Sequence, residues 1–176
     1  INYLKESMKE GFIQSAIYYC NQLIKGSLIP RNIKKAKKIL ETHIKDKDLG
    51  SYFLLYGKIS MHEKKFDQCQ NFYKKSISFD NSESMYKYGR FLIKSKGLVF
   101  NKIKGYDYIK KSIEKGYLKA MYKYGLILHK GDIINIIINK RIGMQLIKIA
   151  AEKGYKDALY YYYSIESKKD NADKEE

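Results

Sequence analysis

The sequence predicts an all-α protein, a right-handed superhelical α-solenoid built from antiparallel helix pairs. Three observations support this prediction. The 176 residues include a single proline, so few positions oppose helix formation. Apolar residues recur three and four positions apart, as in Ile103, Tyr106, Ile109 and Ile113, which is the spacing of one helix face. Similar phrases also return about every 36 residues, a period typical of stacked helical repeats.

The repeat is clearest around a Tyr-Gly pair. "SMYKYGRFLIKSKG" at 84–97 matches "AMYKYGLILHKG" at 120–131. Weaker copies contain Tyr19-Cys20, Tyr56-Gly57 and Tyr162 at the corresponding place. This alignment predicts the first helix of five repeats, at 13–25, 49–62, 82–95, 118–130 and 156–167.

A second helix is expected after an asparagine in three of these repeats. Asparagine is a favoured N-cap because its side chain accepts a hydrogen bond from an N–H group that the first turn leaves unpaired. A small residue follows four positions later, which lets a neighbouring helix approach closely. The second repeat departs from the pattern, since it drops the loop between its helices and places Cys69 at the small position. The asparagines are Asn32, Asn101 and Asn139, followed by Ala36, Gly105 and Gly143.

The phrase Glu-Lys-Gly-Tyr occurs twice, at 114–117 and 152–155. Gly11-Phe12 is a similar pair, a glycine followed by an aromatic residue. Each glycine follows the end of a predicted helix, where a left-handed residue completes the C-terminal cap and glycine adopts that conformation at least cost. We therefore interpret Gly11, Gly116 and Gly154 as corners between helices, not as ligand contacts.

These elements predict a single α-solenoid domain over 1–167, followed by a polar disordered tail at 168–176. The chain opens with the last helix of a truncated repeat, which favours a fragment of a longer protein. Open ends of a repeat array expose apolar surface, so end-to-end self-association of this fragment is expected. The predicted parts are 1–11, the repeats 12–47, 48–81, 82–117 and 118–155, and a further first helix at 156–167.

The repeat unit resembles the Sel-one-like repeat, a longer relative of the tetratricopeptide repeat. The residues that carry the resemblance are Ala120, Tyr124-Gly125, Asn139, Gly143, Ala150-Ala151-Glu152 and Gly154. One repeat earlier they are Ser84, Tyr88-Gly89, Gly97-Leu98, Asn101, Lys104-Gly105 and Glu114-Gly116. Asparagine replaces the family's aspartate at the helix start. The resemblance implies a scaffold or adaptor role in protein complexes and carries no catalytic residues.

The net charge of +16 raises the possibility of a nucleic-acid partner. However, Arg31, Arg90 and Arg141 are the only arginines among 35 basic residues, whereas phosphate and base recognition favours the planar arginine fork. We interpret most lysines as solvated helix faces. Binding of RNA or of an anionic surface by the basic repeat array remains the alternative to a protein partner.

The sequence contains no recognisable catalytic or metal-binding motif. There is no glycine-rich phosphate loop, and the three histidines, His43, His62 and His129, fall at non-equivalent repeat positions. Cys20 and Cys69 are 49 residues apart and occupy small packing positions, which favours free thiols in a reducing compartment. We therefore expect no enzyme activity, no metal, no cofactor and a cytoplasmic location, although a targeting signal upstream of Ile1 would not be seen.

The side of the superhelix lined by first helices, its concave face, is the expected binding surface. If the Tyr-Gly pairs pack inward, the residues two and three positions before each glycine, and one after it, border this groove. Tyrosine offers a large apolar ring with a polar tip, and lysine adds positive potential, so an acidic peptide or segment of a partner protein fits best. The candidate residues are Tyr86, Lys87, Arg90, Tyr122, Lys123, Tyr160 and Tyr161.

Overall fold

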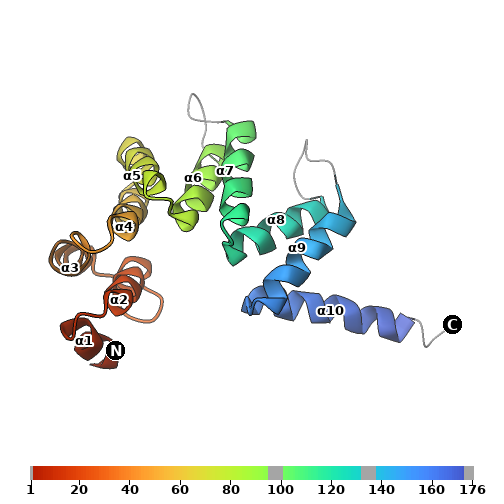
Figure 1. Cartoon of the computed structure of the whole chain (residues 1–176), viewed down its shortest axis with the longest axis horizontal. Helices are drawn as coiled ribbons and strands as arrows, with labels where there is room; N and C mark the ends of the chain where they lie inside the picture. The colour runs from red at the N-terminus through yellow and green to blue at the C-terminus, as the bar shows by residue number, and fades with distance from the viewer. Residues whose placement is uncertain (1, 95–100, 132–137, 173–176) are drawn as a thin grey trace. The chain divides into compact units, whose positions relative to one another are not determined.

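The computed structural model describes residues 2–94, 101–131 and 138–172, and within them the regular structure is entirely helical. This confirms the predicted fold class, and the hand of the superhelix stays a prediction. The helices are α1 (Asn2–Lys9), α2 (Ile13–Lys25), α3 (Ile33–Ile39), η1 (Leu40–Ile44), α4 (Leu49–His62), α5 (Phe66–Ser78), α6 (Ser82–Lys94), α7 (Lys102–Glu114), α8 (Leu118–Lys130), α9 (Lys140–Glu152) and α10 (Lys156–Ala172) (Figure 1). They group into two compact units, Ile1–Gly105 (unit 1) and Tyr106–Glu176 (unit 2).

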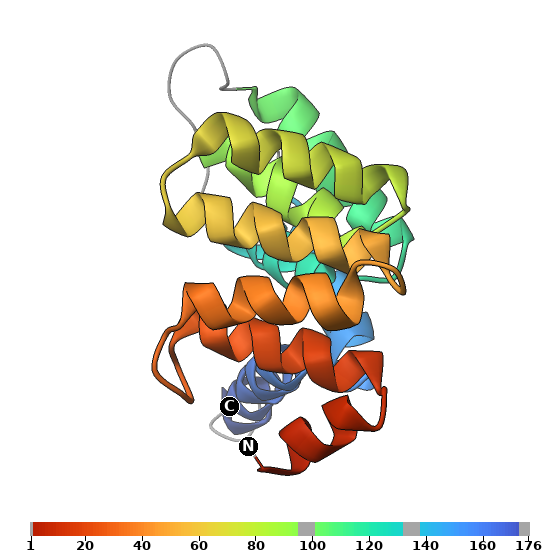
Figure 2. The same ribbon diagram turned by 90° about the vertical axis from the view of Figure 1, so that its left-hand side faces the viewer.

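In unit 1, consecutive helices pack against each other in chain order (Figure 2). The helix α2 contacts α1, α3 and α4, while α5 lies between α4 and α6. Large aliphatic side chains fill the space between these helices, and Leu40, Ile44 and Leu55 are completely buried. A short π-helical turn, η1, continues α3 and carries Leu40 and Ile44 into this core.

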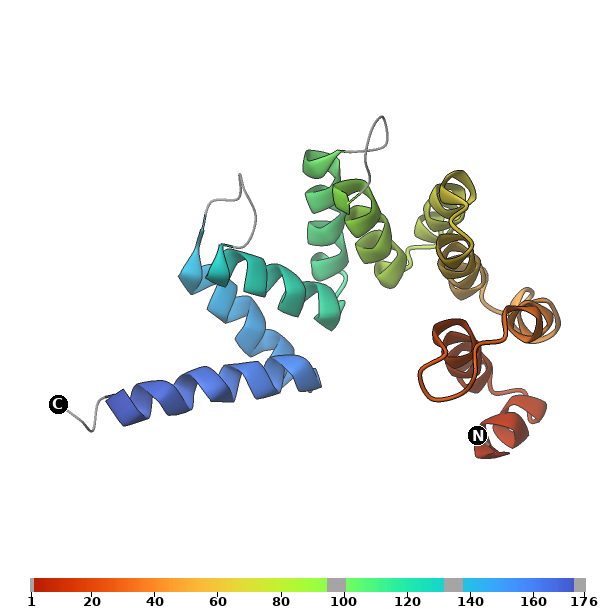
Figure 3. The ribbon, with the colours of Figure 1, turned by 180° about the vertical axis from the view of Figure 1, so that it is seen from behind.

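In unit 2, α9 packs against both α8 and α10, as Figure 3 shows. The core between them contains three small residues, Ala150, Ala151 and Ala158, together with Ile147 and Met121. The alanines that the repeat pattern places inward, Ala120 and Ala158, are fully buried. Small side chains at these positions bring the helix axes close together.

The predicted asparagine caps are confirmed. The side-chain oxygens of Asn32, Asn101 and Asn139 accept hydrogen bonds from the backbone N–H three residues later, at 2.8–2.9 Å. Asp48 and Asn81 cap α4 and α6 in the same way. Each cap satisfies one of the N–H groups that a helix start leaves unpaired. Thus five helix starts are set by the local sequence.

The glycine corners are also confirmed. Gly11, Gly116 and Gly154 have φ angles of +91°, +79° and +82°, in the left-handed region. At each corner the glycine N–H and the next N–H bond back to the last turn, for example Gly154 to Ala151 O at 2.8 Å. In the second repeat the same conformation is held without glycine, by Lys64 at φ +58° and Asp80 at φ +56°.

The small residues of the second helices do lie at close helix contacts. A methyl group added at Gly105 would stand 2.8 Å from the carbonyl oxygen of Gly89 and 2.6 Å from Ile93. In the second repeat the close contact takes another form, because a methyl group on Gly57 would stand 2.5 Å from the ring of Tyr73. The Tyr-Gly pairs therefore serve helix packing, as predicted.

The last helix extends beyond its predicted end. The sequence predicts a first helix at 156–167 and a polar tail from residue 168, but α10 continues to Ala172. The rest of the predicted tail lies outside the described residues, as does Gly97-Leu98. No helix in the described part of the chain has both the length and the apolarity needed to cross a membrane.

Candidate functional site

The seven candidate residues belong to three first helices. Those of α6 lie in unit 1, and those of α8 and α10 lie in unit 2. Their exposure differs by position in the repeat. The candidates of α6 are Tyr86, Lys87 and Arg90, those of α8 are Tyr122 and Lys123, and those of α10 are Tyr160 and Tyr161.

On α6, Tyr86 is part of the packed interior. Its side chain is only 2% exposed, and burial raises the pKa of its hydroxyl. The Arg90 guanidinium lies 5.6 Å from the centre of the Tyr86 ring, within the range of a cation–π contact. Lys87 and Arg90 are both half-buried. The ring at this position therefore supports the fold and offers little surface to a partner.

On α8, Tyr122 is likewise buried, with 7% of its surface exposed. Its ring centre lies 5.5 Å from that of Tyr155 and 6.3 Å from that of Tyr161. Burial raises the pKa of the Tyr122 hydroxyl, and the negative charge of Asp157 raises it further. Tyr122 thus packs at the junction between α8 and α10, where it supports the neighbouring Tyr161.

Two lysines stand over these tyrosine rings. The Lys123 ammonium lies 4.9 Å from the centre of the Tyr122 ring, and the Lys130 ammonium lies 5.3 Å from that of Tyr161. The imidazole of His129 contacts Tyr161 edge to face, with ring centres 6.2 Å apart. We call Tyr122, Lys123, Lys130 and Tyr161 the lysine–tyrosine cluster. It joins the first helices of two successive repeats within unit 2.

Tyr160 does not belong to the lysine–tyrosine cluster. Its side chain is 80% exposed, whereas the adjacent Tyr161 is half-buried against α8. Consecutive residues of a helix point about 100° apart, so the two rings occupy different faces of α10. The structure brings together Tyr122, Lys123 and Tyr161 of the candidates in unit 2 and separates Tyr160 from them.

Unit 1 contains a polar chain across three first helices that the sequence did not indicate. The Lys58 ammonium on α4 bonds to Asn21 of α2 at 2.8 Å and forms an ion pair with Glu83 of α6 at 2.7 Å. The Lys58 side chain is only 12% exposed. Asn21, Lys58 and Arg90 share one repeat position, but nothing in a single sequence shows that Glu83 of the next helix reaches Lys58.

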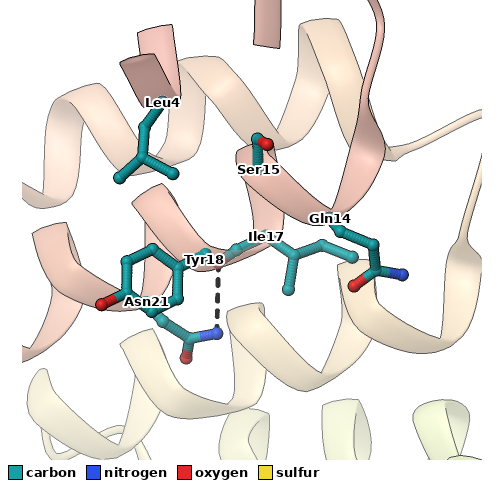
Figure 4. A pocket seen from close by; sticks show the side chains of 6 residues that line it. All are labelled: Leu4, Gln14, Ser15, Ile17, Tyr18 and Asn21. Carbon is teal, nitrogen blue, oxygen red and sulfur yellow. Dashed lines mark hydrogen bonds between the residues drawn. The ribbon is translucent and has the colours of Figure 1, made fainter. Parts of the chain in front are cut away.

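Unit 1 also contains an open pocket of about 430 Å³ between α1 and α2 (Figure 4). Two of its four polar lining residues have hydrogen-bond partners: Ser15 pairs with Ser7 at 2.7 Å, and Asn21 donates to the Ile17 carbonyl at 3.1 Å. The remaining surface is mainly apolar and suits an apolar side chain. The lining residues are Leu4, Gln14, Ser15, Ile17, Tyr18 and Asn21.

The sequence candidates omit Tyr18 and Lys130, yet the repeat contains a signal for one of them. Tyr18 stands two positions before Cys20, as Lys123 stands two before Gly125. The same selection rule applied to the first repeat would therefore have found Tyr18. Lys130 lies at the end of α8, where a basic residue is common because it interacts favourably with the helix dipole. Because a basic residue is common at a helix end for this reason, the sequence gives no sign that Lys130 also contacts a tyrosine ring.

The two cysteine thiols pack in the interior of the protein. Cys20 and Cys69 are free and fully buried, and burial raises the pKa of each to about 12. A thiol is nucleophilic as its thiolate, which is scarce at neutral pH under these conditions. Among the described residues, no three His, Cys, Asp or Glu side chains gather as a metal site would require.

The family model of the Sel1 repeat matches this chain four times, at residues 14–41, 48–78, 82–117 and 118–155. No curated protein matches the chain significantly. The matched ranges cover α2 to α9 and include the confirmed caps and corners at Asn139 and Gly154. The matched ranges therefore contain residues that cap and turn the helix pairs.

Solved structures show the same fold. A Sel1 repeat protein from Oxalobacter formigenes superposes with a TM-score of 0.63 at 15% identity, covering 93% of this chain and 67% of that one. The protective antigen c5321 of uropathogenic Escherichia coli, which displays an SLR fold, gives a TM-score of 0.56 at 16% identity and covers 92% of this chain. The chain spans only 35% of that antigen. With its four matched repeats, this chain belongs to the Sel1 repeat family, whose members generally act as protein-interaction scaffolds.

Proposed function

We propose that this protein is a non-catalytic scaffold that binds a segment of a partner protein along its first helices, on the side predicted to be concave. One observation carries the proposal. The repeat position two residues before the glycine of the Tyr-Gly pair, or its equivalent, holds tyrosine or lysine in four first helices, where Tyr18 and Lys123 are exposed and Lys87 and Tyr161 are half-buried. Only α4 departs, because Leu55 stands there and is fully buried.

In α4, α6 and α8 the neighbouring position supports the fold instead. Tyr86 and Tyr122, three residues before their glycines, are buried, and Leu54 at the same place in α4 is buried as well. In α6 and α8 one position therefore packs and the next is more exposed, whereas α10 reverses this order, with Tyr160 80% exposed and Tyr161 half-buried. In unit 1, Tyr18 is 46% exposed and lines the pocket between α1 and α2, where a partner residue could contact it. Tyrosine anchors in such pockets are frequent energetic centres of protein interfaces.

Selection from a random peptide library displayed on phage tests the proposal. Peptides that bind the wild-type chain should bind the double variant Lys87→Glu/Lys123→Glu at least tenfold more weakly, because two displayed cations become anions. The matched control is Lys34→Glu/Lys153→Glu, which changes the net charge equally at exposed positions on α3 and at the end of α9.

The control variant should retain wild-type affinity, and circular dichroism should show equal helix content in all three proteins. Equal loss in both double variants, or no loss in the first, would contradict binding along the first helices. Selection of no peptide at all, alongside tight binding of an RNA oligonucleotide, would favour the basic-array alternative instead.

A further inference from the structure

The lysine–tyrosine cluster holds two ammonium groups in defined positions. Lys123 and Lys130 are seven residues apart on α8, so both project from the same side of the helix. Each lies over a tyrosine ring, Lys123 over Tyr122 and Lys130 over Tyr161. A cation–π contact restricts a long side chain that would otherwise be mobile, which lowers the entropy lost on binding an anion.

Neither ammonium forms an ion pair with a carboxylate in the described part of the chain. No carboxylate of the described residues lies within 4.0 Å of Lys123 or Lys130, whereas Lys58 in unit 1 has Glu83 at 2.7 Å. Asp157 is near enough to affect Tyr122, but its carboxylate accepts a hydrogen bond from the Tyr155 hydroxyl at 3.3 Å. No described residue therefore neutralises the two positive charges of the cluster.

We propose that the lysine–tyrosine cluster binds an acidic segment of a partner protein through two carboxylates spaced about 10 Å apart. Seven residues of α-helix rise about 10.5 Å, which sets the separation of the two lysine backbones. Three residues of a polyproline II chain rise about 9 Å and complete one turn, so side chains i and i+3 lie on the same face. A polyproline II segment with acidic residues at positions i and i+3 therefore matches the pair. This inference rests on the proposed function.

The contacts favour a carboxylate ligand over RNA. Single-stranded nucleic acids bind largely by stacking bases on aromatic faces. In the cluster, Lys130 occupies a face of Tyr161 and Lys123 occupies a face of the buried Tyr122. The cluster also contains no arginine, whose fork is suited to phosphate. A lysine ammonium is a compact charge on a flexible side chain, and it can therefore pair with a single carboxylate.

Fluorescence anisotropy with two labelled ten-residue peptides tests this inference. One peptide has two glutamates separated by two residues, with a leucine between them. The other has the same composition with adjacent glutamates. The spaced peptide should bind the whole chain about two- to fivefold more tightly at low salt, because it engages both ammonium groups. The difference should shrink as salt is added, since exposed ion pairs are screened.

Variants assign the effect to named side chains. Lys123→Gln and Lys130→Gln should each weaken binding of the spaced peptide about two- to fivefold, as the loss of one exposed ion pair predicts. Lys153→Gln removes the same charge from an exposed site at the end of α9 and should change nothing. Tyr161→Phe keeps the ring under Lys130 and should retain binding. Equal weakening by Lys153→Gln would overturn the proposal.

A uridine 12-mer serves as the second probe. Tighter binding of this RNA than of the spaced peptide, lost on the same two lysine substitutions, would also overturn the proposal. The outcome is separable from that of the proposed function. If displayed peptides need Lys87 and Lys123 but contain no spaced acidic pair, the scaffold function stands and the acidic-segment inference fails.

Discussion

Gly125 on α8 and Gly143 on α9 meet backbone against backbone. A methyl group on Gly125 would stand 2.8 Å from the Gly143 carbonyl oxygen, and one on Gly143 would stand 2.7 Å from that of Gly125. Real methyl groups do not approach carbonyl oxygens so closely. The first repeat makes the corresponding contact with Cys20 and Ala36, where the thiol lies 3.7 Å from the Ala36 carbonyl oxygen. The first repeat therefore accommodates side chains at the position where the fourth repeat has two glycines.

The substitution Gly143→Ala should destabilise unit 2 by about 1–3 kcal/mol. Alanine favours a helix over glycine by about 1 kcal/mol, but the new methyl would meet backbone atoms that cannot move without separating α8 from α9. Urea unfolding followed by circular dichroism measures the change. Gln145→Ala, at an exposed position of α9, should stay within about 0.5 kcal/mol of wild type. A more stable Gly143→Ala protein would show that the helices separate easily.

The substitution Lys64→Gly should stabilise the corner between α4 and α5 by about 0.5–1 kcal/mol. Lys64 has a φ of +58°, which costs an L-residue about 1–2 kcal/mol, and the greater freedom of glycine in the unfolded chain offsets part of the gain. The matched reverse change is Gly154→Ala, at φ +82° with no heavy atom within 4 Å of the added methyl. It should lower the thermal midpoint, since only backbone strain is introduced. The same sign for both substitutions would contradict this account.

The hydroxyls of Ser76 and Ser84 should show an energetic coupling. Ser76 donates to the Gly50 carbonyl oxygen at 2.6 Å, and the two buried hydroxyls lie 2.5 Å apart, so Ser84 donates to Ser76. Ser76→Ala should cost about 1–3 kcal/mol, because the buried Ser84 hydroxyl loses its acceptor and the Gly50 carbonyl oxygen loses a second hydrogen bond. The double variant Ser76→Ala/Ser84→Ala should cost less than the sum of the single variants. Ala150 and Ala158 occupy the corresponding corner of the fourth repeat, which shows that two alanines fit there. Strictly additive losses in a double-mutant cycle would rule out the coupling.

Glu41 should contribute to stability in a pH-dependent way. Hydrogen bonds from the hydroxyls of Tyr56 and Tyr52, at 2.7 and 2.8 Å, hold the pKa of this carboxyl below its usual value. Because its pKa is lower in the folded state, the stabilisation is complete above the unfolded value and is lost as the pH falls through the folded value. Thermal midpoints between pH 6 and pH 2.5 should therefore fall less steeply for Glu41→Gln than for wild type.

The double variant Tyr52→Phe/Tyr56→Phe provides the matched test of that acid dependence. It removes both donors and keeps the two rings, whose centres lie 4.9 Å apart. Its acid dependence should resemble that of Glu41→Gln, since the carboxyl then loses the bonds that lower its pKa. If either variant retains the full acid dependence of the wild type, another group is responsible.

The sequence alone determined the local geometry of the repeat. Glycine at Gly154 and asparagine at Asn139 act within one helix turn of themselves, so their roles follow from residue type and spacing. The helix periods and the small residue at Gly143 likewise recur at fixed intervals, which makes the helix pairs visible without a structure. For the same reason the fold class was predictable, and the ranges matched by the family model include these positions.

Only the tertiary structure decided which repeated side chains face a partner. Tyr122 and Tyr161 are both tyrosines on first helices, yet Tyr122 is buried and Tyr161 lies half-buried under Lys130. Neighbouring helices cover a first helix on more than one side. The helix period therefore does not show which tyrosine rings are buried and which are exposed. Likewise, Lys58 is neutralised by Glu83 while Lys130 has no such partner among the described residues. The charge that a lysine presents depends on residues of adjacent helices, and those distances exist only after the repeats have stacked.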